Sequence, residues 1–78
     1  MPRYYLNVRR KGVLVEDPDG EEAADLSAIR QVAEDTIEDI LRRPETYGGT
    51  QNWDRCTLEI TDVSGTTVMK VPFSEFAE

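Results

Sequence analysis

Residues 25–44 read DLSAIRQVAEDTIEDILRRP and contain the longest regular pattern in the chain. At 100° per residue, most apolar side chains fall on one half of a helical circumference and the acidic side chains on the other half. The half that faces inward consists of Leu26, Ile29, Val32, Ala33, Thr36, Ile37, Ile40 and Leu41. The pattern predicts an amphipathic helix over 26–43, capped by Asp25 and stopped by Pro44.

Two strands are expected before this helix. In Arg3–Arg10, Tyr4, Leu6 and Val8 alternate with more polar residues, which is typical of a half-buried strand. After Lys11-Gly12, the β-branched run Val13–Val15 indicates a second strand. The turn formers of residues 16–20 end it, so the two strands form a hairpin.

Two further strands are expected after the helix. Residues 44–52 contain turn formers and predict a loop. Alternation then resumes over residues 55–61 and 68–73, with a turn at residues 62–65 between them. Pro72 cannot donate a ladder hydrogen bond, so the fourth strand ends there or lies at a sheet edge.

The chain therefore predicts a single α+β domain over residues 1–78 with the element order ββαββ. A four-stranded antiparallel sheet with the helix on one face gives every apolar stripe a partner. The preference for right-handed crossovers favours the strand order 2-1-3-4. The alternative is a sheet in which the first and fourth strands are neighbours. In either arrangement, one sheet face is left uncovered, and we expect a partner on that face or at an open sheet edge.

Composition excludes several classes of protein. The chain has 78 residues, 38% of them hydrophobic, and 16 acids against 9 bases for a formal charge of −7. No run approaches the ~20 apolar residues of a membrane span, and residues 1–11 lack the apolar stretch of a signal peptide. We therefore expect a cytoplasmic protein. The single cysteine excludes an internal disulfide and a multi-thiolate metal site, and the absence of histidine removes the commonest general base and metal ligand.

Catalysis is not expected, and we assign no catalytic, cofactor-binding or metal-binding residue. The serines have no histidine to activate them, and Cys56 alternates in register with the core residues Leu58 and Ile60. The acids of the helix face solvent, without the enclosure that a catalytic carboxylate pair needs to exclude water. Residues 17–21 resemble the start of a calcium loop but lack its later ligands, so a solvated turn is the favoured interpretation.

We expect a partner surface that includes Arg3, Tyr5 and Arg9, together with Tyr47 and Trp53. Basic residues beside tyrosines also suit nucleic acid, but the net charge of −7 opposes a polyanion, so nucleic-acid binding is disfavoured. The alternative for the basic strand is an edge protected by charge. For Trp53 the alternative is a side chain that closes the end of the core.

Arg30 projects inside the apolar arc of the helix, beside Ile37 and Leu41. Two interpretations have equal support. The aliphatic stem of Arg30 lies along the core while its head reaches water, or its guanidinium forms a structural clamp to a carboxylate such as Asp17. Neither interpretation implies catalysis.

Short motifs across nearly the whole chain carry a resemblance to a known family. They are MPRYYLNVR at 1–9, Asp17 with Gly20, Asp25-Leu26 with Arg30, Thr61-Asp62 with Gly65, and Val71-Pro72-Phe73. The chain thereby resembles small uncharacterised α-proteobacterial proteins, common in rhizobia, that are grouped as a domain of unknown function and open M-P-R-Y-[YF]. It departs from them at Asn7, where many members have histidine, and at Arg10. The resemblance implies a stand-alone bacterial protein with no established activity and no cofactor.

The element order is also similar to the N-terminal part of HicB-type antitoxins, which are acidic or neutral covers for a small basic toxin. The charge of −7 suits that role, but the likeness is architectural. From the sequence we therefore expect a non-enzymatic protein-interaction module that self-associates as a homodimer. The alternative is an antitoxin-like acidic inhibitor of a small basic partner.

Overall fold

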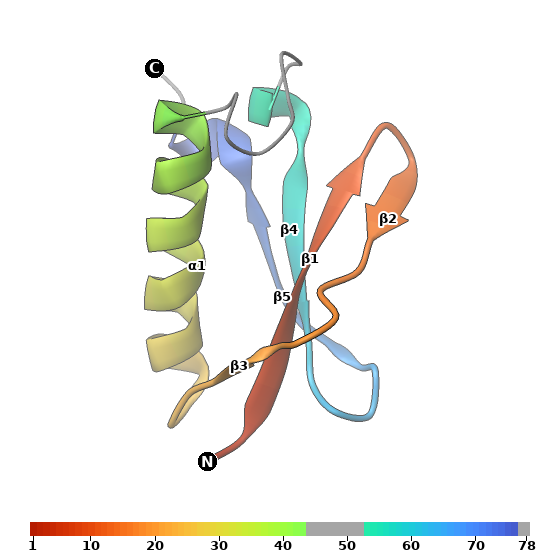
Figure 1. The fold of residues 1–78 in the computed structure, drawn as a ribbon, viewed down its shortest axis with the longest axis vertical. Coiled ribbons are helices and arrows are strands. Elements are labelled where there is room, and N and C mark those ends of the chain that lie inside the picture. Colours follow the sequence, from red (N-terminus) through yellow and green to blue (C-terminus); the bar gives the residue numbers. More distant parts are fainter. Residues whose placement is uncertain (44–52, 77–78) are drawn as a thin grey trace.

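A single helix lies against one face of an antiparallel sheet in the structure of this chain, a computed structural model that describes residues 1–43 and 53–76 (Figure 1). The helix and strands are β1 (Arg3–Arg10), β2 (Val13–Val15), β3 (Glu21–Glu22), α1 (Leu26–Arg42), β4 (Thr57–Thr61) and β5 (Thr67–Pro72). Two 3₁₀ turns, η2 (Trp53–Arg55) and η3 (Phe73–Glu75), flank the last two strands. The expected α+β class is confirmed.

The sheet has five strands in the order β2-β1-β4-β5, with β3 paired to β1 off this path. All the pairings are antiparallel. The four strands expected from the sequence are present with Arg3–Arg10 between Val13–Val15 and Thr57–Thr61. The count of four was incomplete, because β3 is only two residues long and its Glu21-Glu22 sequence shows no alternation of polarity.

The helix begins as predicted. The Asp25 side chain accepts a hydrogen bond from the Ala28 amide at 2.8 Å, which satisfies one of the free donors of the first turn. α1 ends at Arg42, one residue before the predicted end, and Pro44 lies outside the described residues. No helix in the described ranges is long and apolar enough to cross a membrane.

The core lies between α1 and the sheet. Leu6 and Val8 of β1 stand opposite Ile60 and Leu58 of β4, so that these side chains face the helix together. The largest fully buried side chains are Phe73, Ile29, Ile37, Leu58, Ile60 and Val71. Cys56 is buried, as its alternation predicts. The buried residues of α1 thus all pack on one sheet face, and within residues 1–43 and 53–76 no helix covers the other face.

Candidate interaction site on the open sheet face

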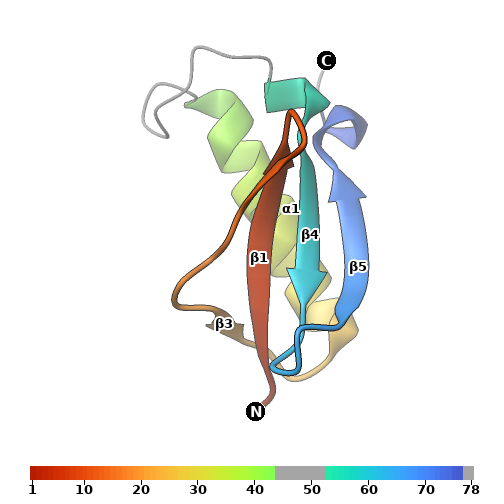
Figure 2. The ribbon, with the colours of Figure 1, turned by 90° about the vertical axis from the view of Figure 1, so that its right-hand side faces the viewer.

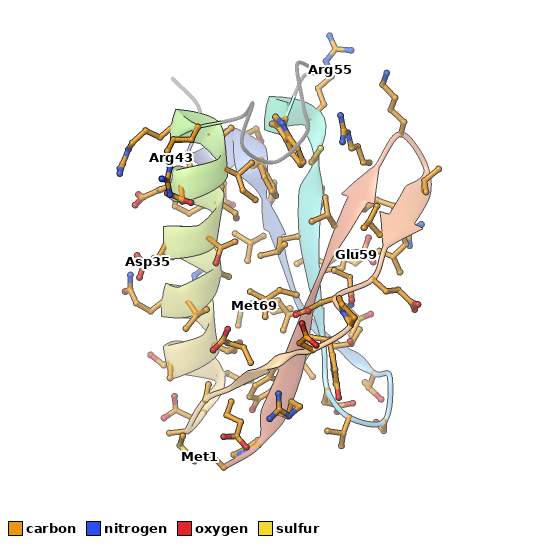
Figure 3. The ribbon with its side chains drawn as sticks, viewed as in Figure 1. Met1, Asp35, Arg43, Arg55, Glu59 and Met69 are labelled. Carbon is orange, nitrogen blue, oxygen red and sulfur yellow. The ribbon has the colours of Figure 1, made fainter. Side chains whose placement is uncertain are left out.

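The sheet face opposite α1 is formed by the alternate residues of β1 and β4. Tyr5 pairs with Thr61, and Asn7 pairs with Glu59. Figure 2 looks onto this face, with α1 behind the sheet. In Figure 3, Met69 lies between α1 and the sheet, whereas Glu59 lies on the side away from the helix. We call this side of the sheet the open face.

The open face is hollowed into a groove of about 620 Å³, here called the open-face groove. Its floor is made by β1 and β4, and its two sides come from residues 16–18 and from the segment that joins β4 to β5. The lining residues are Tyr5, Asn7, Arg9, Leu14, Glu16, Asp17, Pro18, Glu59, Thr61, Asp62, Val63, Gly65 and Thr67. The groove therefore combines one aromatic ring and a few apolar side chains with many polar groups.

Asp17 fixes one side of the groove against β1. Its Oδ2 accepts from the Leu6 amide at 3.2 Å, and its Oδ1 accepts from the amides of Asp19 and Gly20, both at 3.1 Å. The Asp17 amide donates to Asn7 Oδ1 at 2.9 Å. These bonds lie between the β1–β2 and β1–β3 pairings, where the chain makes no regular ladder. The Asp17 side chain thus replaces a strand at this part of the β1 edge.

Asn7 is 4% exposed, although it lies on the face away from the helix. Its Nδ2 donates to the Glu59 carbonyl at 3.1 Å and to Thr61 Oγ1 at 3.2 Å. With the Asp17 amide on Oδ1, both ends of the Asn7 amide group are satisfied. Asn7 therefore joins the floor of the groove to its side.

Gly20 lets the β2–β3 connection approach β1. Its φ is +76°, and a Cβ built there would lie 2.9 Å from both the Tyr4 carbonyl and Tyr5 Cε1. Only glycine fits this conformation and this contact without movement of its neighbours. The close approach places the Tyr5 ring against the backbone that borders the groove.

Arg9 and Glu59 form a two-point ion pair across β1 and β4. Arg9 Nε lies 3.0 Å from Glu59 Oε2, and Nη2 lies 3.4 Å from Oε1. The pKa of Glu59 is lowered, mainly by the hydrogen bond from Arg9. Burial raises this pKa, while the positive charges of Arg9 and Lys70 lower it further. The same bond raises the pKa of Arg9. Both groups are therefore charged near neutral pH. Two of the guanidinium nitrogens of Arg9 are engaged by Glu59.

Asp62 forms the opposite side of the groove. Its Oδ1 accepts from the Ser64 hydroxyl at 2.6 Å, the Ser64 amide at 2.9 Å and the Thr66 amide at 3.0 Å. The pKa of Asp62 is lowered, mainly by the hydrogen bond from the Ser64 hydroxyl. Burial raises this pKa, and the hydrogen bonds from backbone amides lower it further. The carboxylate is thus ionised and held in place by the turn.

Comparison with known protein families shows to which family the chain belongs. A family model described as a domain of unknown function (DUF6894) matches residues 3–74, a range that spans all five strands and α1. The chain belongs to the DUF6894 family. No similar protein of curated function and no similar solved structure was found. The expected membership of a domain-of-unknown-function family is confirmed, while the α-proteobacterial origin and the HicB likeness stay predictions.

The partner-surface residues of this DUF6894 chain lie in different places. Tyr5 and Arg9 line the open-face groove. Arg3 lies at the start of β1. Its Nη2 is 3.5 Å from Glu22 Oε2, and its Nη1 donates a hydrogen bond of 2.7 Å to the Asp19 carbonyl. Trp53 is 8% exposed and stacks on Phe73 with ring centroids 6.0 Å apart, which fits the interpretation that it closes the core. Tyr47 lies outside the described residues.

Of the two interpretations of Arg30, the structure contradicts the clamp to Asp17. Arg30 Nε lies 3.0 Å from Glu34 Oε2, and Nη2 lies 3.6 Å from Glu75 Oε1. Arg30 belongs to the helix side of the sheet, whereas Asp17 lines the groove on the opposite face. The Asp17 oxygens are also occupied by backbone amides. Arg30 instead links α1 to η3.

Sequence reasoning did not predict the roles of Asn7, Glu59 and Asp62 in the groove. A signal for Asn7 exists, because it interrupts the more basic side of the first strand with an uncharged amide. The register between β1 and β4 places it opposite Glu59, and single-sequence patterns do not give that register. Within residues 1–43 and 53–76, no group of three potential ligands is placed to hold a metal ion.

Proposed function

We propose that the chain is a non-enzymatic protein-interaction module that receives a partner on the open face of its sheet. The open-face groove is the observation that carries this proposal. It joins the half-buried ring of Tyr5 and half-buried Leu14 to charged groups, on a face that α1 leaves uncovered. Protein interfaces commonly combine such an apolar anchor with a polar rim.

The chemistry of the groove supports binding in preference to catalysis. Both Glu59 and Asp62 have lowered pKa values, so each is a weak base and holds no proton to donate near neutral pH. The sequence contains no histidine, and Cys56 is buried in the core on the other side of the sheet. A bound partner needs none of these groups to change protonation.

We also propose that two copies associate through β5. In the part of the chain that the structure describes, β5 has a strand on one side only, so its outer backbone groups are open to pairing. Pairing of β5 with a second β5 would extend the sheet and leave each groove open. Sedimentation velocity tests this: we expect the sedimentation coefficient to rise with concentration, and a monomer at high micromolar concentration would contradict it.

The second candidate is an acidic inhibitor of a small basic partner, comparable in role to an antitoxin. The carboxylates of the groove and the charge of −7 favour it. Co-expression with the neighbouring reading frame tests this role. Rescue of growth from a toxic neighbour would support it, and a harmless neighbour would count against it.

A photo-crosslinking amino acid tests the use of the open face. We would place it at Leu14, which lines the groove, and for comparison at Gln31, which is exposed on α1. We expect a discrete protein adduct from the Leu14 position and none from the Gln31 position in the same cell extract. Equal adducts at both positions, or none at Leu14, would contradict the proposal.

A further inference from the structure

We infer that the open-face groove binds an extended basic segment of a partner protein, with arginine or lysine side chains held between its carboxylates and the Tyr5 ring. This inference rests on the proposed function and adds the chemistry of the partner. It concerns a segment of a few residues, because a groove of about 620 Å³ accepts a few side chains and not a globular surface.

The charge of the groove selects a cation. Its lining has one guanidinium, Arg9, against four carboxylates, Glu16, Asp17, Glu59 and Asp62, for a formal charge of −3. Arg9 is already paired with Glu59. Among the described residues, the other three carboxylates have no ion pair. A cationic segment therefore meets uncompensated negative charge on both sides of the groove, and the whole-chain charge of −7 attracts it from a distance.

Two of these carboxylates have oxygens that can accept from a ligand. Glu16 is exposed and makes no hydrogen bond or ion pair with any described residue. The hydrogen bonds that Asp62 accepts from other described residues all end at Oδ1, so Oδ2 remains to accept. Asp17 adds negative charge to the groove while its Oδ1 accepts two backbone amides and its Oδ2 accepts one. The two accepting carboxylates come from opposite sides of the groove.

Tyr5 adds an aromatic surface to this negative site. The backbone of Gly20 lies against its ring, close enough that a Cβ on Gly20 would be 2.9 Å from Tyr5 Cε1. A ring fixed beside carboxylates attracts guanidinium and ammonium groups through its π-face. The same charges repel the phosphates of a nucleic acid, so a polyanion is a poor occupant. A second copy of this chain remains the alternative occupant, and the test includes it.

The probe is a short peptide of alternating arginine and glycine, with a control peptide in which citrulline replaces arginine. We would titrate each into ¹⁵N-labelled protein and follow the backbone amides by NMR. We expect the arginine peptide to shift amides of residues 5–9, 16–17 and 59–67, and the citrulline peptide to shift none. Shifts scattered over α1, or equal binding of the citrulline peptide, would overturn the inference.

A matched pair of double variants separates the groove from the overall charge. Glu16→Gln with Asp62→Asn removes two carboxylates from the groove, and asparagine keeps the Oδ1 acceptor of the Asp62 turn. Asp35→Asn with Glu38→Gln removes two carboxylates from exposed positions on α1; Figure 3 shows Asp35 on the helix. We expect the groove pair to weaken peptide binding about fivefold or more. The helix pair should change it less than about twofold. Equal losses would overturn the inference.

One outcome separates this inference from the proposed function. If the arginine peptide leaves the groove unchanged, while the same amides shift as the protein alone is concentrated, the occupant is a second copy. The basic segment is then wrong and the proposed interaction module stands. The proposed function fails together with the inference if three results are negative: the arginine peptide shifts no groove amide, concentrating the protein shifts none, and the crosslinker at Leu14 gives no adduct.

Discussion

Asn7 and Asp17 join β1 to the segment between β2 and β3 through two reciprocal hydrogen bonds, in each of which one side chain bonds to the backbone of the other segment. The Asp17 amide donates to the Asn7 side-chain oxygen at 2.9 Å, and the Asp17 carboxylate accepts from the amide of Leu6, the neighbour of Asn7, at 3.2 Å. The segment between β2 and β3 is thereby held alongside β1 without a regular ladder (Figure 1). One side of the open-face groove depends on this arrangement.

Replacement of Asp17 by alanine should destabilise the fold. The amides of Leu6, Asp19 and Gly20 lose their acceptor, and a part-buried donor left unsatisfied costs about 1–3 kcal/mol. Urea denaturation measures the change in the free energy of unfolding. The matched control is Glu16→Ala, which removes an adjacent exposed carboxylate and should change it by less than about 0.5 kcal/mol. Equal effects of the two substitutions would contradict the role of Asp17.

Gly20→Ala should cost more stability than Gly12→Ala. Both glycines have a positive φ, +76° and +79°, so alanine at either position carries a similar backbone penalty of about 1–2 kcal/mol. At Gly12 a Cβ meets nothing within 4 Å, whereas at Gly20 it meets the Tyr4 carbonyl at 2.9 Å. Overpacking adds about 1–3 kcal/mol at Gly20. Thermal unfolding of both variants gives the difference, and similar costs would show that the close approach is absent.

Stability should fall as the pH falls below about 5. The pKa values of Glu59 and Asp62 are lowered from their ordinary values of 4.5 and 3.8 in the folded protein, so the unfolded chain binds protons first. Their contribution is complete above the unfolded pKa values and is lost as the pH falls through the folded ones. The pKa of Arg9 is raised by the hydrogen bond to Glu59, so Arg9 does not titrate in this range.

Carboxyl NMR titration checks this directly. We expect midpoints below 4.5 for Glu59 and below 3.8 for Asp62. Arg9→Met should move the Glu59 midpoint upward, because it removes the hydrogen bond and the nearest positive charge. Arg55→Met removes an exposed arginine elsewhere and should leave that midpoint in place. If the Glu59 titration midpoint is unchanged in Arg9→Met, that result would contradict the ion pair.

The sequence predicted the fold better than the site, for a physical reason. α1, β1, β4 and β5 follow from periodicities of 3.6 and 2, which record which face of each element is buried, and β2 follows from a β-branched run. The Asp25 cap is local in the same way and is confirmed. β3 was missed because two consecutive glutamates carry no periodic signal, and their pairing with Arg3 and Tyr4 is fixed by Asp17 and Gly20.

The site depends on register and on chain crossings, which no local pattern encodes. Arg9 meets Glu59 because β1 and β4 pair in one particular register across 50 residues of sequence. For Arg30, the pattern left a clamp to Asp17 open beside a snorkelling side chain, and the sheet lies between Arg30 and Asp17. For Trp53, it left a partner surface open beside a side chain that closes the core, and the stacking on Phe73 fits the second interpretation. Each of these choices depends on contacts between distant segments.

Trp53 should report on unfolding and not on the groove. It is the one tryptophan of the sequence and is 8% exposed, with the Arg10 guanidinium 4.5 Å from its ring centroid. We expect blue-shifted emission that acrylamide quenches poorly in the native state and readily in urea. The arginine peptide should leave the emission unchanged, because the groove lies on the other face of the sheet. Arg10→Ala should lower the free energy of unfolding by about 0.5–1 kcal/mol, against less than about 0.5 kcal/mol for the exposed Arg42→Ala. Strong quenching in the native state would contradict the buried position of Trp53 and return it to the candidate partner surface.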